Sequence, residues 1–234
     1  MKARLYVASV LAGLALLVIM VVVVLNYGRH DPSPPSLRDH PNPAIPGKVI
    51  YVDEDQCIRR VPASGGDAEE LYCLSRNEYV SRLFYIDDQT IGFARSDSRG
   101  EILYEVNLTT RAVRDTGLSV STWKASDVGL VSPSGEEIFS DDSGGVYLLK
   151  DGTRTIVAEF NVRDYGGPNP VIWSPDGQWI LLHYWGRSDT TELWIVSRDG
   201  AIRGTLASHA GGRAAAWYIE GAGSYPPLPE AYRR

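Results

Sequence analysis

The sequence predicts an all-β domain of about four units, each with four short strands, preceded by one apolar helix. From Lys48 onward, apolar residues come in short runs separated by Gly, Asp, Ser and Pro, and no long amphipathic helix pattern is present. A Ser-Pro-x-Gly turn occurs twice in this region, and a long uncharged stretch lies near the N-terminus. Gly (23), Tyr (13) and Trp (6) supply the turns and flat side chains that short hairpin strands require.

The first element is a predicted transmembrane helix over residues 5–27, after a short N-terminal segment of residues 1–4. No charged residue occurs from Leu5 to Leu25, and a helix of this length, rising about 1.5 Å per residue, crosses the roughly 30 Å hydrocarbon layer. A cleaved signal peptide is the alternative, but its apolar region usually has about 7–15 residues and is followed by a small-residue cleavage pattern. Residues 21–25 show no such pattern, and no cysteine precedes Cys57 to accept a lipid. We therefore expect an uncleaved signal anchor.

The orientation of this anchor rests on two features. Lys2 and Arg4 precede the span, whereas Arg29 and Arg38 follow it, so the positive charges give only a weak asymmetry. The short N-terminal segment leaves the long C-terminal part as the exported portion. We expect a single-pass protein of the cell membrane, with a cytoplasmic N-terminus and an extracytoplasmic β domain.

Residues 28–47 are predicted to form a Pro-rich linker. Six prolines fall between residues 31 and 47, with few apolar residues to bury. This composition is typical of an extended, polyproline-like spacer. Such a spacer would hold the domain away from the membrane.

The two cysteines, Cys57 and Cys73, are candidates for a disulfide. The bond would close a loop of about 16 residues, which the chain-entropy model values at about 3 kcal/mol. A reduced, buried pair is the alternative that the spacing leaves open. The expected oxidising compartment favours the disulfide.

The clearest repeat unit begins at Val171. Its first strand runs into the turn Trp173-Ser174-Pro175-Asp176-Gly177, and an apolar strand follows over residues 179–182. Residues 192–196 and 202–206 supply a third and a fourth strand. Four strands thus occupy about 40 residues, a period typical of β-propellers.

The same pattern recurs elsewhere in the chain. Upstream, Ser132-Pro133-Ser134-Gly135 takes the place of residues 174–177, and residues 146–149 supply the third strand. A weaker copy begins at Phe84 and lacks the proline. The repeats therefore predict a propeller-like array.

The two ends of the β domain complement each other. Residues 48–52, 57–61 and 70–73 match the second, third and fourth strands of a unit that lacks its opening strand. Near the C-terminus, residues 214–221 match an opening strand and its turn, because Trp217 and Gly221 keep the spacing of Trp173 and Gly177. Pairing the two ends would remove an exposed sheet edge. We therefore place the β domain at 48–221, followed by a Pro-containing tail over 222–234.

These motifs resemble the TolB-type β-propeller repeat, whose signature is a Trp-Ser-Pro-Asp-Gly turn, an apolar strand, a strand similar to Leu-Trp-Ile-Val, and a Gly turn. Residues 173–196 carry the resemblance most strongly. It implies a fold and not an activity. Propellers of the family have six or more blades, and TolB has an N-terminal α/β domain that this sequence does not show. A four-bladed ring, an incomplete ring and a sheet array completed by a partner all stay open.

Composition and motifs argue against several function classes. The 23 Lys and Arg residues against 29 Asp and Glu residues disfavour a nucleic-acid partner. Asp142-Ser143-Gly144-Gly145 matches four letters of a serine-protease motif, but turn residues are expected there and no histidine motif accompanies them. The four histidines lack the spacing of a zinc site, and no nucleophile elbow is present. We expect a non-enzymatic protein with no catalytic residue, cofactor or metal.

Candidate interaction residues fall into two kinds. Three acidic clusters at similar-looking loop positions can ring one face and bind calcium or a basic partner, or can be ordinary turn carboxylates. Trp185, just before a predicted loop, is the best candidate for an exposed aromatic contact. The acidic candidates are Asp53, Asp55, Asp87, Asp88, Asp141 and Asp142.

The expected function is a membrane-tethered, extracytoplasmic interaction module that binds a protein partner, as an accessory subunit of a membrane complex. Two features favour this function: the sequence predicts a rigid β domain attached to a membrane, and it shows no catalytic motif. A sensor that binds a small molecule or an ion in a central channel is the alternative. A degenerate relative of propeller-containing peptidases is a further one.

Overall fold

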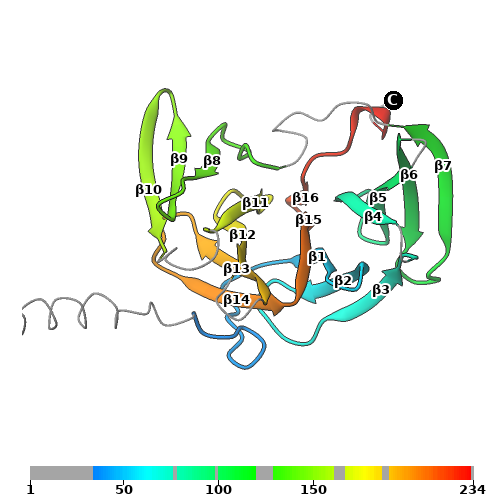
Figure 1. The fold of residues 1–234 in the computed structure, drawn as a ribbon, viewed down its shortest axis with the longest axis horizontal. Helices are drawn as coiled ribbons and strands as arrows, with labels where there is room; N and C mark the ends of the chain where they lie inside the picture. The colour runs from blue at the N-terminus through cyan, green and yellow to red at the C-terminus, as the bar shows by residue number, and fades with distance from the viewer. Residues whose placement is uncertain are drawn as a thin grey trace, which may run out of the picture. The chain divides into compact units, whose positions relative to one another are not determined.

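The computed structural model describes residues 34–75, 78–97, 100–119, 129–160, 167–185 and 190–232. In these ranges the chain is all-β except for a short 3-10 turn, η2 (Glu230–Tyr232), and its strands form four antiparallel sheets (Figure 1). The predicted all-β, propeller-like class is confirmed. The predicted membrane span at 5–27 lies outside the described residues, and none of the helices described is long and apolar enough to cross a bilayer.

We call the four sheets blades 1 to 4, in the order in which the chain enters them. Blade 1 has the strand order β16 (Gly223–Tyr225), β15 (Ala210–Ile219), β1 (Lys48–Asp53), β2 (Cys57–Pro62), β3 (Glu69–Cys73). Blade 2 contains β4 (Tyr79–Tyr85), β5 (Thr90–Asp97), β6 (Gly100–Asn107) and β7 (Val113–Ser119). Blade 3 contains β8 (Glu137–Ser140), β9 (Gly145–Lys150) and β10 (Thr153–Glu159). Blade 4 contains β11 (Asn169–Trp173), β12 (Trp179–Trp185), β13 (Thr191–Ser197) and β14 (Arg203–Ser208).

Blade 1 joins the two ends of the β domain. β15 pairs with β1 in antiparallel register, which places Trp217 opposite Val49. The pairing predicted from the complementary ends is therefore confirmed. The Trp217 side chain is fully buried, and its indole N–H donates to the carbonyl of Pro46 at 2.9 Å.

The repeated turns of blades 3 and 4 share one hydrogen-bond pattern. In blade 4, the hydroxyl of Ser174 accepts the N–H of Trp179 at 2.9 Å and donates to Asp176 at 2.5 Å. The turn then closes through Gly177, whose N–H donates to the Ser174 carbonyl and whose φ is +66°. Gly suits this position because other residues are strained at positive φ. Pro175 precedes Asp176 in the same turn.

The corresponding turn in blade 3 uses Ser132 and Gly135. Ser132 Oγ accepts the N–H of Glu136, and Gly135 has a φ of +83°. The opening strand of this blade shortens to a single bridge between Val131 and Glu137, just before Pro133. Gly221 occupies the related turn after β15, with a φ of +82°.

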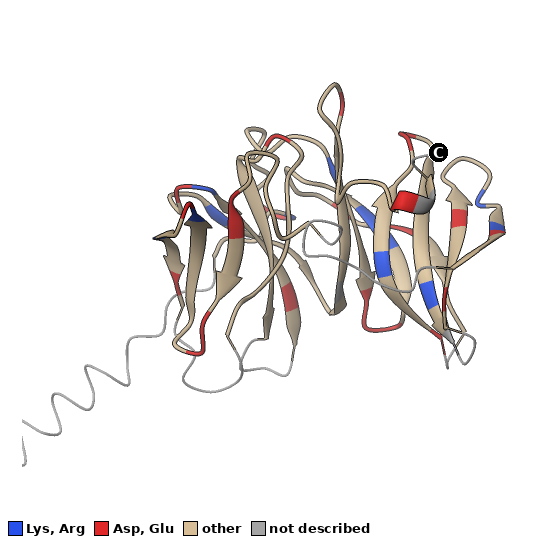
Figure 2. Cartoon of the chain, turned by 90° about the horizontal axis from the view of Figure 1, so that it is seen from above, with Lys and Arg blue, Asp and Glu red and all other residues tan. Residues whose placement is uncertain are grey.

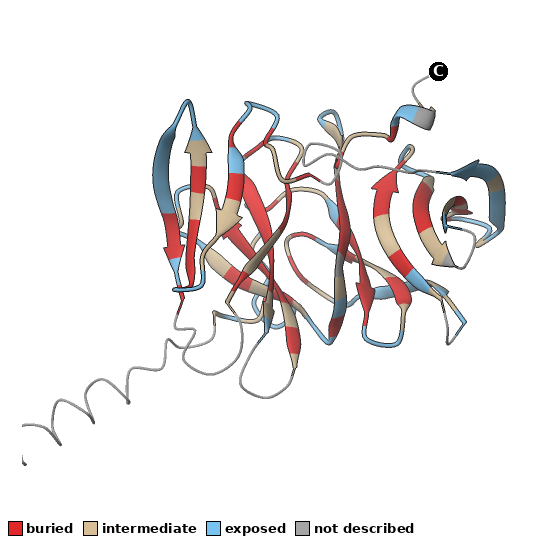
Figure 3. Cartoon of the chain, turned by 45° about the horizontal axis from the view of Figure 1, so that its top comes forward, coloured by how far each residue is buried: buried red, intermediate tan, exposed pale blue. Residues whose placement is uncertain are grey.

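Apolar cores connect the blades in the order 3, 4, 1, 2 (Figure 3). One core joins blades 1 and 4, a second joins blades 1 and 2, and a third joins blades 3 and 4. In the part of the chain that the structure describes, no core cluster joins blades 2 and 3. Among the described residues, blades 2 and 3 are therefore the two ends of the array of connected cores.

The segment before β1 differs from the expected extended spacer, because residues 34–47 lie on the domain. Leu37 and Ile45 are only 3% and 2% exposed and belong to the core between blades 1 and 4. The Leu37 N–H donates to the carbonyl of Thr205 at 2.8 Å. Two apolar residues among the prolines are enough to anchor the segment, since each buried side chain contributes about 1.5–3 kcal/mol.

Candidate functional site

The acidic candidates do not form a single ring. Successive turns of an antiparallel sheet lie at opposite ends of its strands, and Figure 2 shows acidic residues in loops at both ends. Asp53 with Asp55 lies in the β1–β2 turn, Asp141 with Asp142 in the β8–β9 turn, and Asp87 with Asp88 in the β4–β5 turn. When β15 and the bridge at Val131 are counted as the opening strands of blades 1 and 3, the first two turns join second to third strands, whereas the β4–β5 turn joins a first to a second strand.

Asp53 and Asp141 stabilise their turns in the same way. One oxygen of Asp53 accepts the N–H groups of Asp55 and Cys57 at 3.0 and 2.8 Å. One oxygen of Asp141 accepts the N–H groups of Ser143 and Gly145 at 3.1 and 3.0 Å. These carboxylates are committed to their own backbone, which favours the ordinary turn interpretation over a calcium site.

Ser143, the serine of the protease-like motif, belongs to this second turn. Its hydroxyl donates to Asp141 at 2.6 Å, so its hydrogen-bond partner is a carboxylate. Together with the N–H groups of the turn and the side chain of Arg154, this bond holds the pKa of Asp141 well below its usual value.

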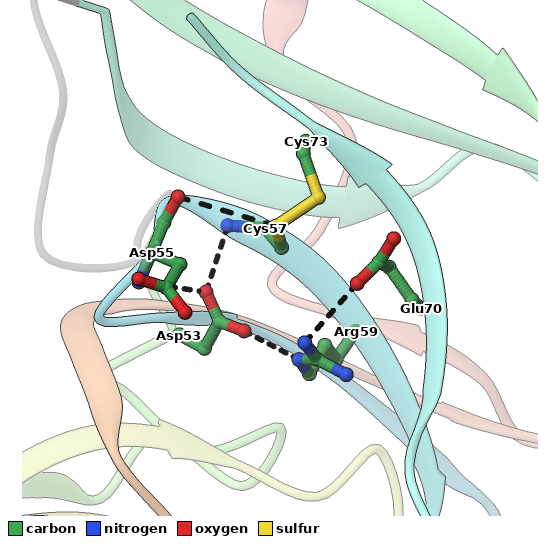
Figure 4. The surroundings of a disulfide bond; sticks show 6 residues. All are labelled: Asp53, Asp55, Cys57, Arg59, Glu70 and Cys73. Atoms are coloured by element: carbon green, nitrogen blue, oxygen red, sulfur yellow. Dashed lines mark hydrogen bonds and ion pairs between the residues drawn. A yellow bond between two sulfur atoms is a disulfide. The ribbon is translucent and has the colours of Figure 1, made fainter. Parts of the chain in front are cut away.

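Asp53 is a buried carboxylate that forms an ion pair with the partly buried Arg59. It is 6% exposed and pairs with the guanidinium of Arg59, which reaches Glu70 at 3.1 Å (Figure 4). The hydrogen bond that Arg59 donates to Asp53 raises the pKa of Arg59 above its already high usual value. A buried carboxylate held in this way fixes the side chain of Arg59 in one place.

The predicted disulfide between Cys57 and Cys73 is confirmed. The two residues are directly opposite each other in the register of β2 and β3, and Figure 4 shows the bond beside Glu70. The Glu70 carboxylate and the two sulfur atoms lie within 4.8 Å of one another. Since the sulfur atoms are bonded to each other, they are not free thiolates for a metal ion.

A polar cluster at the seam between blades 1 and 4 lies beside this ion pair. Glu54, from the β1–β2 turn, accepts a hydrogen bond from Thr191 at 2.9 Å and contacts Nδ1 of His209 at 3.1 Å. The Thr191 hydroxyl also lies 2.5 Å from the carbonyl of Ala210, so these two acceptors share one proton. The hydrogen bond from Thr191, followed by that from His209, lowers the pKa of Glu54.

An adjacent cleft of about 470 Å³ runs along the same seam. Three carboxylates and two guanidinium groups line it, and Glu54 and Glu70 contact the lining residues His209 and Arg59. Five acidic groups against two basic ones give a formal charge of −3 with His209 neutral. The lining groups are Asp53, Asp55, Asp67, Arg38 and Arg59. We call the cleft, the Glu54 cluster and Glu70 together the acidic seam.

Trp185 ends β12 beside the acidic seam. It lies opposite Thr191 in the pairing of β12 with β13, and Thr191 in turn bonds Glu54. The Trp185 side chain is 53% exposed, a large value for an indole. The structure thus places the aromatic candidate and the Asp53–Asp55 cluster at one seam, and leaves Asp87 and Asp88 at the opposite end of the strands.

Sequence reasoning did not find Thr191, His209 or Arg59. Thr191 and His209 are 137 and 155 positions from Glu54 in the chain, so no local pattern connects them. Arg59 follows Asp53 by six positions, a distance at which opposite charges on paired strands can meet across a tight turn. That spacing could have predicted the ion pair of Asp53 with Arg59.

A smaller cavity of about 210 Å³ lies among the inner strands. Arg82, Val171, Ala214 and Pro226 contribute to its lining, from β4, β11, β15 and the C-terminal tail. Burial lowers the pKa of Arg82. Ligand pockets usually measure about 300–1,000 Å³, so this cavity has room only for a small ligand.

No protein-family model matches the chain, and no curated protein matches it. Among solved structures, the chain is similar to TolB from Acinetobacter baumannii, at 14% identity over 72% of this chain and 43% of that one, with a TM-score of 0.27. It is also similar to a putative TolB from Agrobacterium tumefaciens, at 18% identity over 75% of this chain and 61% of that one, with a TM-score of 0.27. A prolyl endopeptidase structure matches at 14% identity over 70% of this chain and 28% of that one, with a TM-score of 0.25. The chain spans only part of each of these proteins, and the similarity concerns the propeller-like fold alone.

Proposed function

We propose that this protein is a membrane-tethered, extracytoplasmic interaction module without enzymatic activity, and that its acidic seam binds a basic segment of a protein partner. The observation that carries the proposal is the half-exposed Trp185, which lies opposite Thr191, whose hydroxyl bonds Glu54 of the acidic seam. The seam carries five carboxylates against two guanidinium groups. Tryptophan is among the residues that are enriched at binding hot spots. The net charge of −6 on the whole chain also speeds encounters with a basic partner.

The tether is inferred from the sequence, in which no charged residue occurs from Leu5 to Leu25. A helix of that length suffices to cross the hydrocarbon layer. A β domain held in this way suits an accessory subunit of a membrane complex.

A small-molecule or ion sensor is the second candidate function. The cavity of about 210 Å³ beside Arg82 favours it, since a guanidinium group suits a small anion. We rank it below protein binding because the volume is smaller than that of most ligand sites.

The test is a pull-down of the full-length chain in mild detergent through a C-terminal tag, followed by mass spectrometry. Trp185→Ala and Asp55→Lys change the acidic seam, whereas Asp88→Lys makes the same charge change in the β4–β5 turn. We expect a stoichiometric partner that the two seam variants lose and the control retains. A partner that all four proteins retain would contradict the assignment of the seam, and a C-terminal tag labelled only from the cytoplasm would contradict the orientation.

A further inference from the structure

A cleft of about 780 Å³ lies between blades 3 and 4. Its walls come from the β9–β10 turn of blade 3, and from the start of β12 and the β13–β14 turn of blade 4. Trp185 and Thr191 lie at the other end of β12 and β13, so the cleft is separate from the acidic seam. The volume falls within the range of about 300–1,000 Å³ that is usual for ligand sites.

The apolar part of this cleft consists of Leu148, Trp179 and Ile202. Leu148 and Trp179 are buried, whereas Ile202 is 40% exposed. A ligand that covers an exposed apolar side chain gains about 25 cal/mol for each Å² of apolar surface removed from water. This part of the cleft therefore favours a ligand with apolar side chains.

A buried carboxylate holds two cations on the wall of the cleft. Glu136 is 5% exposed, and its Oε1 atom accepts a hydrogen bond from the guanidinium of Arg198 and lies 3.9 Å from the ammonium group of Lys150. The side chains of Arg198 and Lys150 are 39% and 48% exposed. Two cations thus share one carboxylate. In the part of the chain that the structure describes, one positive charge and several N–H donors are left for a ligand.

Two aspartates lie in the turns beside the cleft, and only one of them is committed to its own turn. Asp199 accepts the Ser197 hydroxyl at 2.6 Å and the N–H of Ala201 at 3.1 Å, and the bond from Ser197 lowers the pKa of Asp199. Asp151 is exposed, and its carboxylate has no ion pair or hydrogen bond among the described residues. One negative charge is therefore available in the same cleft as one positive charge.

We propose that this cleft binds a short apolar peptide whose carboxylate and ammonium groups are both free. The peptide carboxylate binds Arg198 and Lys150, since guanidinium geometry suits a planar carboxylate. The ammonium group binds Asp151. An apolar side chain of the peptide covers Ile202.

The charges favour a zwitterion over a simple anion or cation. The cleft has three carboxylates and two cations, so an anion meets a formal charge of −1, and a cation meets two cationic groups. A zwitterion pairs with both kinds of group and leaves the bond between Glu136 and Arg198 intact. The volume is near the upper end of the usual range, which favours a few residues over a single amino acid. The polar groups that can meet a peptide backbone belong to Thr153, Thr155 and Gln178.

Isothermal titration calorimetry of the full-length chain in mild detergent tests the ligand class. The probe is the tripeptide Leu-Ala-Leu with free ends, compared with its N-acetyl form, its C-terminal amide and triglycine. We expect the free tripeptide to bind and the other three to bind about tenfold more weakly, because each lacks one recognised feature.

Two results of this titration would overturn the proposal. One is no binding of the free tripeptide at up to about 1 mM. The other is equal binding of the acetylated form, because the ligand would then be any apolar carboxylate, such as the C-terminus of a protein.

Two variants assign the ends of the peptide. Asp151→Asn is expected to weaken binding of the free tripeptide about three- to tenfold and to leave binding of the acetylated form unchanged, because that form has no ammonium group. Lys150→Gln is expected to weaken binding of the free tripeptide to a similar extent and to leave binding of the amide unchanged. Losses of the same size for all forms of the peptide would contradict the assigned ends.

The matched control is Asp88→Asn, which makes the same change at an exposed position of the β4–β5 turn. It is expected to leave binding unchanged, and an effect equal to that of Asp151→Asn would contradict the site. The result is separate from the function proposed for the acidic seam. Trp185→Ala changes the other end of β12 and is expected to leave binding of the tripeptide unchanged.

Discussion

Aspartate side chains stabilise the tight turns of this domain by accepting hydrogen bonds from the backbone. Asp87, Asp176 and Asp199 each accept the N–H group two positions ahead, at 2.8, 3.0 and 3.1 Å. Asp53 and Asp141 accept the N–H groups two and four positions ahead. Asp is suited to this role because its short side chain reaches its own turn. The acidic clusters are therefore first of all features of the turns, and the binding role that we propose concerns only those in the acidic seam.

The buried pair of Asp53 and Arg59 leads to the first prediction. Asp53→Ala removes the acceptor of two backbone N–H groups and leaves the Arg59 guanidinium without its main partner. We expect the free energy of unfolding to fall by about 2–3 kcal/mol, measured by urea denaturation. Asp55→Ala, at an exposed position two residues later, should change it by less than about 0.5 kcal/mol. Equal effects of the two substitutions would contradict a stabilising role of the pair of Asp53 and Arg59.

The second prediction concerns the pH dependence of the seam. Hydrogen bonds from Thr191 and His209 lower the pKa of Glu54 from its ordinary value of 4.5. A carboxylate with a lowered pKa in the folded state stabilises the fold above the unfolded-state pKa and loses this contribution as the pH falls through the folded-state value. The stabilisation by Glu54 is therefore complete above about pH 5 and is lost as the pH falls through and below 4.5.

Thermal unfolding of the wild type and Glu54→Gln across this range measures the effect. We expect the wild type to be slightly more stable at about pH 6 and the two proteins to converge near pH 3. Because Glu54 is well exposed, the difference should be small and should shrink in high salt. A difference that grows as the pH falls would contradict the assigned direction of the pKa shift.

At the scale of elements, the third prediction concerns the disulfide between β2 and β3. It closes a 16-residue separation, and the chain-entropy model gives about 3 kcal/mol for a loop of this size. We expect Cys57→Ala with Cys73→Ala to lower the free energy of unfolding by about that amount. A thiol reductant should reduce the stability of the wild type in urea and leave that of the double variant unchanged. A reductant effect on the double variant would show that the loss comes from elsewhere.

The strands that sequence reasoning identified are those with buried faces. Apolar runs and the Ser-Pro-x-Gly turns mark β11 and β12, and the complementary ends of the domain predict the pairing of β15 with β1. Edge strands carry much less signal. β7 is exposed along nearly its whole length, and four successive residues of β10 are exposed, so neither shows the alternation that reveals a half-buried strand. The acidic seam was only half predictable, because its contacts join Glu54 to residues more than 100 positions away.

For the whole molecule, the repeats predict the number of blades but not how the array ends. The repeat pattern reflects contacts within one blade. The way the array ends depends on the segments that pack between the blades or against the last one. Leu37 and Ile45 dock the N-terminal segment between blades 1 and 4, and Leu228 and Tyr232 cover blade 2. Each segment is Pro-rich with only a few apolar residues, so composition alone suggests a spacer or a tail. The few apolar residues determine that each segment packs on the domain, because each side chain fills a site that the blades leave open.

The last prediction concerns this C-terminal cover. Deleting residues 226–234 removes Leu228 and Tyr232 and exposes the small core formed by Phe84, Ala94 and Leu103. Two partly buried side chains of this size contribute roughly 2–4 kcal/mol, so we expect a loss of stability in this range and new binding of a hydrophobic dye. Tyr232→Phe is the matched control, since it keeps the ring against Phe84 and removes only a buried hydroxyl that has no hydrogen-bond partner among the described residues. It should not lower the stability, because no hydrogen bond is lost, and it should expose no apolar surface. If the deletion leaves both stability and dye binding unchanged, the tail does not cover blade 2.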